Sequence, residues 1–471
     1  MTHKHKLLPL MLAAILAAPS AHAAVDLIAI GTLSGNATDL STESAGALEN
    51  GAAGNLFGGI GSGIAYAGCN TLLAVPDRGP NAVAYNTAVS DTTSYINRFH
   101  TLSIDLSTSA PGSALPFELT PTLTTTTLLR APQKLVYGDG ILAGLSDGAP
   151  ALNAVNHTYY LTGRADNFVA TQLSTYALDG RFDPESIRVS NDGSSVFISD
   201  EYGPYIYRFN RKTGQRTAVV AVPDMFAISH LSADGNVEIS GNTSGRVSNK
   251  GMEGLAISAD GTTLYGAMQS PLAQDGGTKA RYTRILKIDL VTGATSQYAY
   301  PLTNIGTTSK PKYPTISDIV AVNNHEFLVD ERDGDGLGAD SPAVFKKLFH
   351  IDLDGAQDVS SFVGESTLAP AAVDKGDPFL DIVAVLNAHG FASNDIPAKL
   401  EGIAFGPDVD VDGVTKHTLF VANDNDFVGT VIDGNHPDPG IDNPNRFFVF
   451  AVDSSDLPTY EAQQLAKKSC K

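Results

Sequence analysis

The chain has 471 residues, and its 51 acidic side chains outnumber 31 basic ones to give a formal net charge of −20 at pH 7. A surface this acidic repels polyanions, which argues against nucleic acid and anionic lipid as partners. Gly, Ser and Thr are abundant, Trp is absent and long helical periodicity is rare, which is typical of an all-β chain.

Residues 1–24 read as a secretory signal peptide. Lys4 and Lys6 precede the apolar run LLPLMLAAILAA, and a small-residue cleavage site follows at Ala21–Ala23. The run is too short to cross a bilayer, and no other stretch matches its length. We therefore expect one exported, monomeric domain over 25–471, periplasmic or extracellular, without a membrane span. Losing the two lysines would change the net charge from −20 to −22.

One strand–turn–strand unit recurs along the rest of the chain. In each copy an apolar strand leads to a turn such as Asp260-Gly261 and then to a second strand, so the first strand's start meets the second strand's end. Further strands follow most copies, and four strands form a propeller blade. The sequence therefore predicts a single six-bladed β-propeller, with two β-sandwich domains as the alternative. The six copies lie at 61–79, 133–148, 184–203, 249–272, 316–334 and 400–426.

The two ends of the chain provide the closure that a ring of sheets needs. Val25–Leu33 is a strand without a neighbour in sequence, and Phe447–Asp453 is a strand near the other end. We expect the first to complete the blade that contains the second, which leaves no open sheet edge. The insertion 376–398 and the tail Tyr460–Cys470 both read as containing a short helix. An exported chain can also join Cys69 and Cys470 in a disulfide.

Several motifs together resemble a known family. The segments DRGPNA, SDEYGPYIYRFN, NKGMEGLAIS, LVDER and KLEGIAF are similar to those of exported bacterial phytase-like proteins, the "esterase-like activity of phytase" family. The resemblance covers most of the mature chain. It implies an esterase or phosphoesterase-like hydrolase that acts on a small molecule. The sequence departs from the Glu-Gly pattern in the first copy, where Ser62-Gly63 stands, and in the second, where no clear acid is present.

The repeats predict a cluster of carboxylates at one mouth of the central channel. So many facing acids require compensation by arginines or by a hard cation such as Ca²⁺. We predict Arg78 and Arg332, taken as equivalent repeat positions, as contacts for an anionic substrate group, and Glu201 and Glu331 as catalytic bases. The alternative is that these acids cap backbone N–H groups and join neighbouring blades through arginines. The predicted metal ligands are Glu185, Glu253, Asp318, Glu401, Asp424 and Asp426.

The sequence leaves three functions open. It has no G-x-S-x-G elbow, Walker loop or H-E-x-x-H motif, so those chemistries are not indicated. The first hypothesis is a Ca²⁺-assisted hydrolase of an anionic phosphate ester. The second is a metal-dependent propeller lactonase or sugar-ester hydrolase. The third is a non-catalytic binding protein of the cell envelope.

Overall fold

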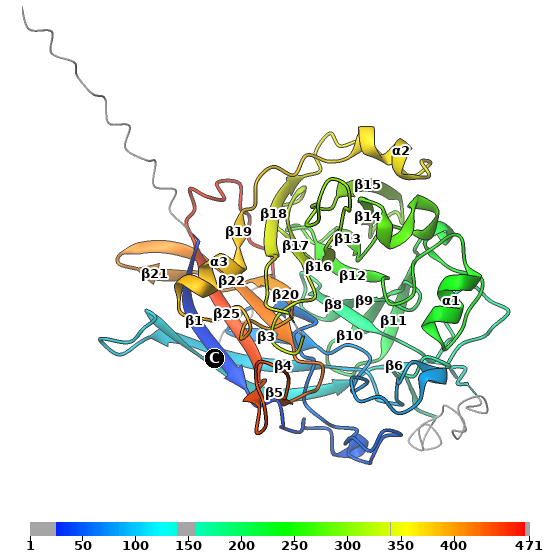
Figure 1. Cartoon of the computed structure of the whole chain (residues 1–471), viewed down its shortest axis with the longest axis horizontal. Coiled ribbons are helices and arrows are strands. Elements are labelled where there is room, and N and C mark those ends of the chain that lie inside the picture. The colour runs from blue at the N-terminus through cyan, green and yellow to red at the C-terminus, as the bar shows by residue number, and fades with distance from the viewer. Residues whose placement is uncertain (1–24, 139–156, 340, 467–471) are drawn as a thin grey trace, which may run out of the picture.

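The structure is a computed structural model that describes residues 25–138, 157–339 and 341–466. The predicted signal peptide 1–24 lies outside the described residues. Within the described part, the strands form five large sheets, which are arranged as blades around a central channel, and two small sheets of two strands each (Figure 1). The chain is therefore the all-β propeller that the repeats predict, with five blades instead of six. None of the described helices is long and apolar enough to cross a membrane.

Each blade has four antiparallel strands in sequence across the sheet, to which blade 5 adds the short strand β21 (Val409–Val411) paired with β22 (Val414–Asp424), and the first strand of each hairpin lies innermost. Blade 1 contains β2 (Gly63–Tyr66), β3 (Thr71–Val75), β4 (Arg98–Thr108) and β5 (Phe117–Leu128). Blade 2 contains β8 (Pro184–Val189), β9 (Ser195–Asp200), β10 (Ile206–Asn210) and β11 (Arg216–Val220). Blade 3 contains β12 (Met252–Ile257), β13 (Thr263–Met268), β14 (Tyr282–Asp289) and β15 (Thr295–Pro301).

The last two blades follow the same plan, with the chain's ends meeting in blade 5. Blade 4 contains β16 (Thr315–Ala321), β17 (Glu326–Arg332), β18 (Lys346–Asp352) and β19 (Leu380–Asp381). Blade 5 contains β20 (Lys399–Phe405), β22 (Val414–Asp424), β25 (Asn445–Val452) and β1 (Asp26–Leu33). The remaining elements are β6 (Arg130–Ala131), β7 (Tyr159–Tyr160), β21 (Val409–Val411), β23 (Thr430–Val431), β24 (Ile441–Asp442), α1 (Gly235–Gly241), α2 (Glu365–Leu368) and α3 (Ile382–Ala388).

The predicted closure by the N-terminal strand is present. β1 pairs with β25 over the register Asp26↔Ala451 to Leu33↔Asn445, so the dark blue strand lies beside the red one in Figure 1. It covers the edge that β25 would otherwise expose. The helix predicted within 376–398 is also present, as α3, whose N-cap Asp381 accepts a hydrogen bond from Ala384 N.

The prediction of a sixth blade at 133–148 is wrong. The inner strands β2, β8, β12, β16 and β20 contact one another in a closed sequence, and β2 touches both β8 and β20. No gap remains between blades 1 and 2 for another inner strand. Between β5 and β8 the described residues contribute only the two-residue strands β6 and β7, while 139–156 lie outside the described residues.

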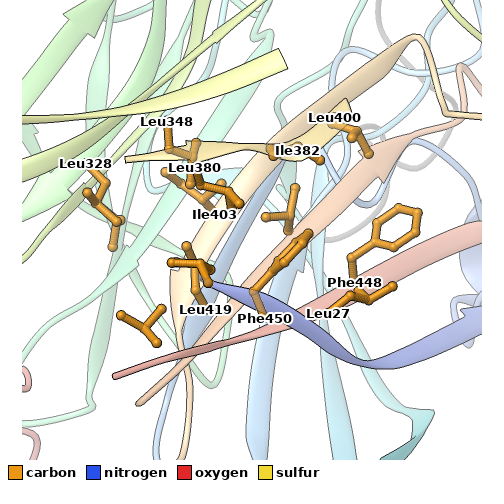
Figure 2. Close-up of a cluster of buried hydrophobic side chains, with 14 of the residues drawn as sticks. Leu27, Leu328, Leu348, Leu380, Ile382, Leu400, Ile403, Leu419, Phe448 and Phe450 are labelled. Atoms are coloured by element: carbon orange, nitrogen blue, oxygen red, sulfur yellow. The ribbon is translucent and has the colours of Figure 1, made fainter. Parts of the chain in front are cut away.

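Apolar side chains fill the space between neighbouring blades. Figure 2 shows one such cluster, where Leu328 and Leu348 of blade 4 lie together with Leu419 and Phe450 of blade 5. Leu27 of β1 belongs to the same cluster. The N-terminal strand thus contributes side chains to the blade interface as well as backbone pairing.

The tail does not form the predicted helix in its described part. Residues 460–466 have no regular secondary structure and cross the turn ends of the blades, where the ring of Tyr460 packs on Phe405 with centroids 4.4 Å apart. Their backbone N–H groups bond to blades 4, 3 and 2 through Glu461 N to Val322 O at 2.8 Å, Gln464 N to Ala259 O at 2.9 Å and Ala466 N to Asn191 O at 2.6 Å. Cys69, in the blade 1 turn, is disulfide-bonded, and Cys470 lies outside the described residues.

Candidate functional site: an acidic channel mouth

The strand register places two side chains of each blade at the channel mouth opposite the tail. We locate them by counting from one residue pair in each blade, formed between the inner strand and the second strand. These five equivalent pairs are Ile64↔Ala74, Ile187↔Ile198, Leu255↔Gly266, Ile319↔Val329 and Ile403↔Val421. Two residues before the inner-strand member lies the first slot, occupied by Ser62, Glu185, Glu253, Ser317 and Glu401. Three residues after its partner lies the second slot, occupied by Asp77, Glu201, Gln269, Arg332 and Asp424.

A β-bulge accompanies the first slot in four blades. The register shifts between Pro184 and Ile187, and again between Met252 and Gly254. Equivalent shifts lie at Ile316/Ile319 and Leu400/Ile403. A bulge re-aims side chains out of the regular alternation of a strand. It therefore allows an acid to stand beside the channel at the end of an otherwise apolar strand.

Two groups of carboxylates result from this arrangement. Asp183, Glu185 and Glu201 have ligand oxygens within 4.8 Å of one another, and all three side chains are buried. Asp77, Asp424 and Asp426 form the second group, with oxygens equally close. We call the two slots, together with Arg78, Asp183, Lys399 and Asp426, the acidic mouth.

Five acids of the mouth, namely Asp77, Asp183, Glu185, Glu253 and Asp424, have pKa values raised by burial. Burial, reinforced by the charge of Glu253, raises the pKa of Glu185 well above its usual range. Burial and the nearby Glu201 raise the pKa of Glu253 in the same way. Burial raises the pKa of Asp424 to about 6. The negative charge of these carboxylates must therefore be offset, either by bound protons or by a bound cation.

Three cationic side chains offset part of this charge. Arg332 binds Glu401, and Lys399 Nζ lies 2.8 Å from Asp424 Oδ2 and also binds Asp426. Arg78 Nη1 lies 2.6 Å from Asp183 Oδ2. The acidic mouth holds eight carboxyls, namely Asp77, Asp183, Glu185, Glu201, Glu253, Glu401, Asp424 and Asp426, against these three cations. Glu185 and Glu253 have no ion pair among the described residues.

Unpaired polar atoms gather on the blade 3 side of the mouth. Glu253 is 3% exposed and its Oε2 has no hydrogen-bond partner within the described chain; the same holds for Oε1 of Gln269, which is 4% exposed. Leaving a buried acceptor without a partner is costly. Carboxylate oxygens are the ligands that hard cations such as Ca²⁺ prefer. Asp183, Glu185 and Glu201, with Glu253 beside them, therefore fit a hard divalent cation.

Asp318 has a different surrounding from the other predicted metal ligands. It lies one residue beyond the first slot, where three other blades have glycine, and it is fully buried. Arg188 Nη2 donates to both of its oxygens at 2.9 and 2.8 Å, and Ser186 Oγ donates at 2.9 Å. Backbone N–H groups of Leu255 and Ile403 donate at 3.3 and 3.0 Å. Asp318 thus joins the blades at the channel centre, as the alternative interpretation of the acids describes.

Glu331 lies on the other side of its strand from the mouth. It occupies the position equivalent to Asp200, one residue before the second slot, and alternate strand residues point to opposite faces. Its Oε1 accepts hydrogen bonds from Tyr300 OH at 2.7 Å and from Lys375 Nζ at 2.5 Å, and the side chain is fully buried. This environment holds Glu331 as a packed ion pair away from Glu201.

The two predicted substrate arginines are not equivalent either. Arg332 occupies the second slot, where it is 8% exposed, and its Nε donates to Ser317 Oγ at 2.7 Å. Arg78 lies one residue past that slot and has a side chain that is 17% exposed. Arg332 is enclosed by Glu401 and Ser317, so Arg78 is the more accessible of the two.

Sequence reasoning missed two charged members of the mouth. Asp183 lies one residue before Pro184, the first residue of its repeat copy, and Lys399 lies two residues before Glu401. Both lie at strand entries, where the apolar pattern gives no signal. A polar residue directly before each apolar inner strand is the feature that could have identified them.

Comparisons with known proteins agree with the resemblance seen in the motifs. A family model described as "Phytase-like: Esterase-like activity of phytase" matches residues 55–427. An "Uncharacterized secreted protein" of Arthroderma benhamiae is 30% identical over 307 residues, which cover 58% of this chain and 54% of that protein. The chain thus spans about half the length of this relative.

Solved structures are only distantly similar. The periplasmic gluconolactonase of Pseudomonas aeruginosa is 12% identical with a TM-score of 0.33, and the match covers 90% of this chain and 96% of that one. A luciferin-regenerating enzyme is 11% identical with a TM-score of 0.33, over 88% of this chain and 97% of that one. TM-scores this low carry no conclusion about function.

Proposed function

The chain belongs to the Phytase-like family, described by the esterase-like activity of phytase, and from this premise we propose that it hydrolyses a phosphate ester of a small anionic molecule at the acidic mouth. One observation carries the proposal: the buried carboxylates of Asp183, Glu185 and Glu201 converge beside the partly exposed Arg78. Arg78 Nη1 lies 4.0 Å from Glu201 Oε2, so the cationic and anionic groups are adjacent.

We propose that Asp183, Glu185 and Glu201 hold a divalent cation, Ca²⁺, with Glu253 next to them. When bound, such a cation offsets the carboxylates, polarises a phosphoryl oxygen and lowers the pKa of a bound water. The donor set supports a hard cation, because carboxylates supply its coordinating atoms and no histidine belongs to the group. Asp424 and Asp426 are less suited, since Lys399 already pairs with both.

The chain's own residues supply the remaining roles. Arg78 would bind the anionic group of the substrate, because a guanidinium matches phosphate geometry with two parallel hydrogen bonds. Glu253 would hold and transfer a proton, since burial and the charge of Glu201 raise its pKa well above its usual range. Glu201, whose Oε2 lies 4.0 Å from Arg78 Nη1 and which also interacts with Glu253, would orient both of these side chains. Arg332 would keep Glu401 in place.

Export supports a role for calcium. The relative from Arthroderma benhamiae is described as secreted, and residues 1–24 of this chain read as a signal peptide. We therefore propose that the protein acts outside the cytoplasm. Extracellular Ca²⁺ modules bind with dissociation constants of about 10⁻⁴–10⁻³ M, so a site of modest affinity would suffice there.

The test is a calorimetric Ca²⁺ titration of chelator-stripped protein in two buffers of different ionisation enthalpy. Binding should release protons, because acids with raised pKa values must lose them to coordinate the cation. Glu185→Gln should abolish binding, while Glu118→Gln, on an exposed part of β5, should not. Phosphate esters, carboxyl esters and lactones are then assayed with and without the cation.

Each outcome of the assay selects one hypothesis. Turnover of phosphate esters that needs Ca²⁺ and is lost in Glu253→Gln supports the proposal. Turnover of lactones or carboxyl esters alone would replace it with the lactonase or sugar-ester hydrolase. Activity that survives both chelation and Glu253→Gln rejects the metal mechanism. Cation binding without turnover of any ester would make the chain a binding protein.

A further inference from the structure

A cavity of about 180 Å³ opens beside the acidic mouth. Arg78 and Tyr202 line it on the side of the mouth, and Arg181, Glu238, Ser248 and Asn249 are among its other lining residues. We call this cavity the arginine pocket. It brings side chains of blade 2 together with the segment that contains α1.

Arg181 is built into the wall of this pocket. It is 1% exposed, and its guanidinium lies over the rings of Phe168 and Tyr202 at 4.7 and 5.1 Å. Its Nη1 lies 3.4 Å from Ala165 O and 3.8 Å from Glu238 Oε2, and the carboxylate of Asp179 is also near enough to act on its charge. Nε and Nη2 are buried without a hydrogen-bond acceptor in the described part of the chain. A buried guanidinium that leaves two nitrogens unused is poised to donate to an anion.

Positive charge around the pocket exceeds what its own acid can balance. Glu238 Oε1 accepts from Arg246 Nη1 at 2.7 Å, so Arg181 and Arg246 share one carboxylate. Arg246 Nη2 and Arg78 Nε are further buried N–H groups for which the described residues offer no acceptor. Two arginines, Arg78 and Arg181, thus line the pocket against one carboxylate, and the acids near them, Asp183 and Asp179, stand outside its lining.

We propose that the arginine pocket binds an oxyanion group of the substrate, phosphate or carboxylate, next to the ester that the acidic mouth hydrolyses. That the anion belongs to a substrate rests on the proposed function. That the pocket binds an anion rests on the pocket alone. Arg78 lines the pocket and lies 2.6 Å from Asp183, so it connects the two sites. The substrate class is thus an ester that carries a second anionic group a short distance from the bond that breaks.

The experiment measures anion binding without catalysis. Orthophosphate, sulfate and acetate are titrated by calorimetry into chelator-treated protein, and phosphorus NMR line widths report the orthophosphate arm independently. Orthophosphate and sulfate binding without acetate binding assigns a tetrahedral oxyanion, and acetate binding alone assigns a carboxylate. If none of the three anions binds to the wild type, the inference is overturned.

Two variants of Arg181 test its role. Arg181→Met keeps an unbranched side chain between Phe168 and Tyr202 and should weaken anion binding by about tenfold or more, since hydrogen bonds to charged groups are lost. Arg181→Lys keeps the charge but not the planar fork and should fall between this variant and the wild type. The control is Arg216→Met, which removes another buried guanidinium lying over an aromatic ring, that of Tyr207 at 4.4 Å, and which does not line the pocket. Wild-type affinity in Arg181→Met would overturn the inference.

A steric variant decides the matter if Arg181→Met does not fold. Ser248 lines the pocket and is half-buried, so Ser248→Leu should block it, while Ser309→Leu on an exposed loop should not. Unchanged anion binding in Ser248→Leu would also overturn the inference. Hydrolysis is not measured in any of these arms. Intact anion binding in a protein that hydrolyses no ester would therefore refute the proposed function and leave the pocket standing.

Discussion

Replacing Asp318 with alanine should destabilise the fold strongly, and the loss of stability should be the same in the presence and in the absence of Ca²⁺. The carboxylate accepts two hydrogen bonds from Arg188 Nη2 and others from Ser186 Oγ and from the backbone N–H groups of Leu255 and Ile403. Its removal leaves a buried guanidinium without a counter-charge, which costs about 3–5 kcal/mol. Each backbone N–H left unpaired adds to that loss, at about 1–3 kcal/mol. We expect a total loss of at least about 3 kcal/mol in the free energy of unfolding.

The measurement is urea unfolding of the wild type and Asp318→Ala, each with Ca²⁺ and with chelator. Lys416→Met is the control, because Lys416 pairs with Asp453 at 3.2 Å in a partly exposed position where about 0–1 kcal/mol is expected. The double variant Arg188→Met with Asp318→Leu should recover part of the loss, since it removes both buried charges. A loss below about 1 kcal/mol, or one that appears only with Ca²⁺, would refute the role at the channel centre and return Asp318 to the metal ligands.

Three other predictions follow from the same structure. Cation-free protein should lose thermal stability as the pH rises from about 4 to about 8, because burial raises the pKa of Asp424 to about 6 and that of Asp200 to about 8. The folded protein then keeps protons that the unfolded chain releases near pH 4. A melting temperature that is independent of pH between 4 and 9 would contradict this prediction. Glu331→Gln should lower stability but keep Ca²⁺ affinity, whereas Glu201→Gln should lose that affinity in calorimetry; equal Ca²⁺ affinities would count against the separation of these residues. Deletion of residues 25–33 should expose the edge of β25 and cause aggregation on size exclusion, and a monodisperse product with an unchanged melting temperature would disprove the closure.

Local pairing was predictable from the sequence because it depends on neighbouring residues. The Asp260-Gly261 turn and the apolar strands on either side determine that β12 and β13 pair antiparallel, as the register Met252↔Met268 confirms. The number of blades was not predictable in this way. It depends on how many inner strands close a ring, which is a property of contacts between blades.

The different placement of Asp318 and Glu331 from the other predicted site residues has a common physical cause. A bulge inserts a residue that the alternation of a strand does not reveal, so Asp318 was aligned with the glutamates although Ser317 occupies their slot. Glu331 was aligned with Glu201 because both follow an aspartate in the sequence. The register instead aligns Glu331 with Asp200, and a shift of one residue moves a strand side chain to the opposite face.

The arrangement of charge explains how an anionic substrate can reach a carboxylate-lined mouth. Arg188 and Asp318 fill the channel centre and the tail crosses its far end, so the acidic mouth is the end of the channel that the tail leaves uncovered. There the acids of blades 1, 2, 3 and 5 would repel a phosphate in the absence of local positive charge. Arg78 supplies such charge at the boundary, with Asp183 on one side and the arginine pocket on the other. Because Arg78 belongs to both sites, an anion held in the pocket lies beside the carboxylates instead of among them. The positive charge of the arginine pocket can then bind one group of a substrate while the carboxylates of the acidic mouth act on another group of the same molecule.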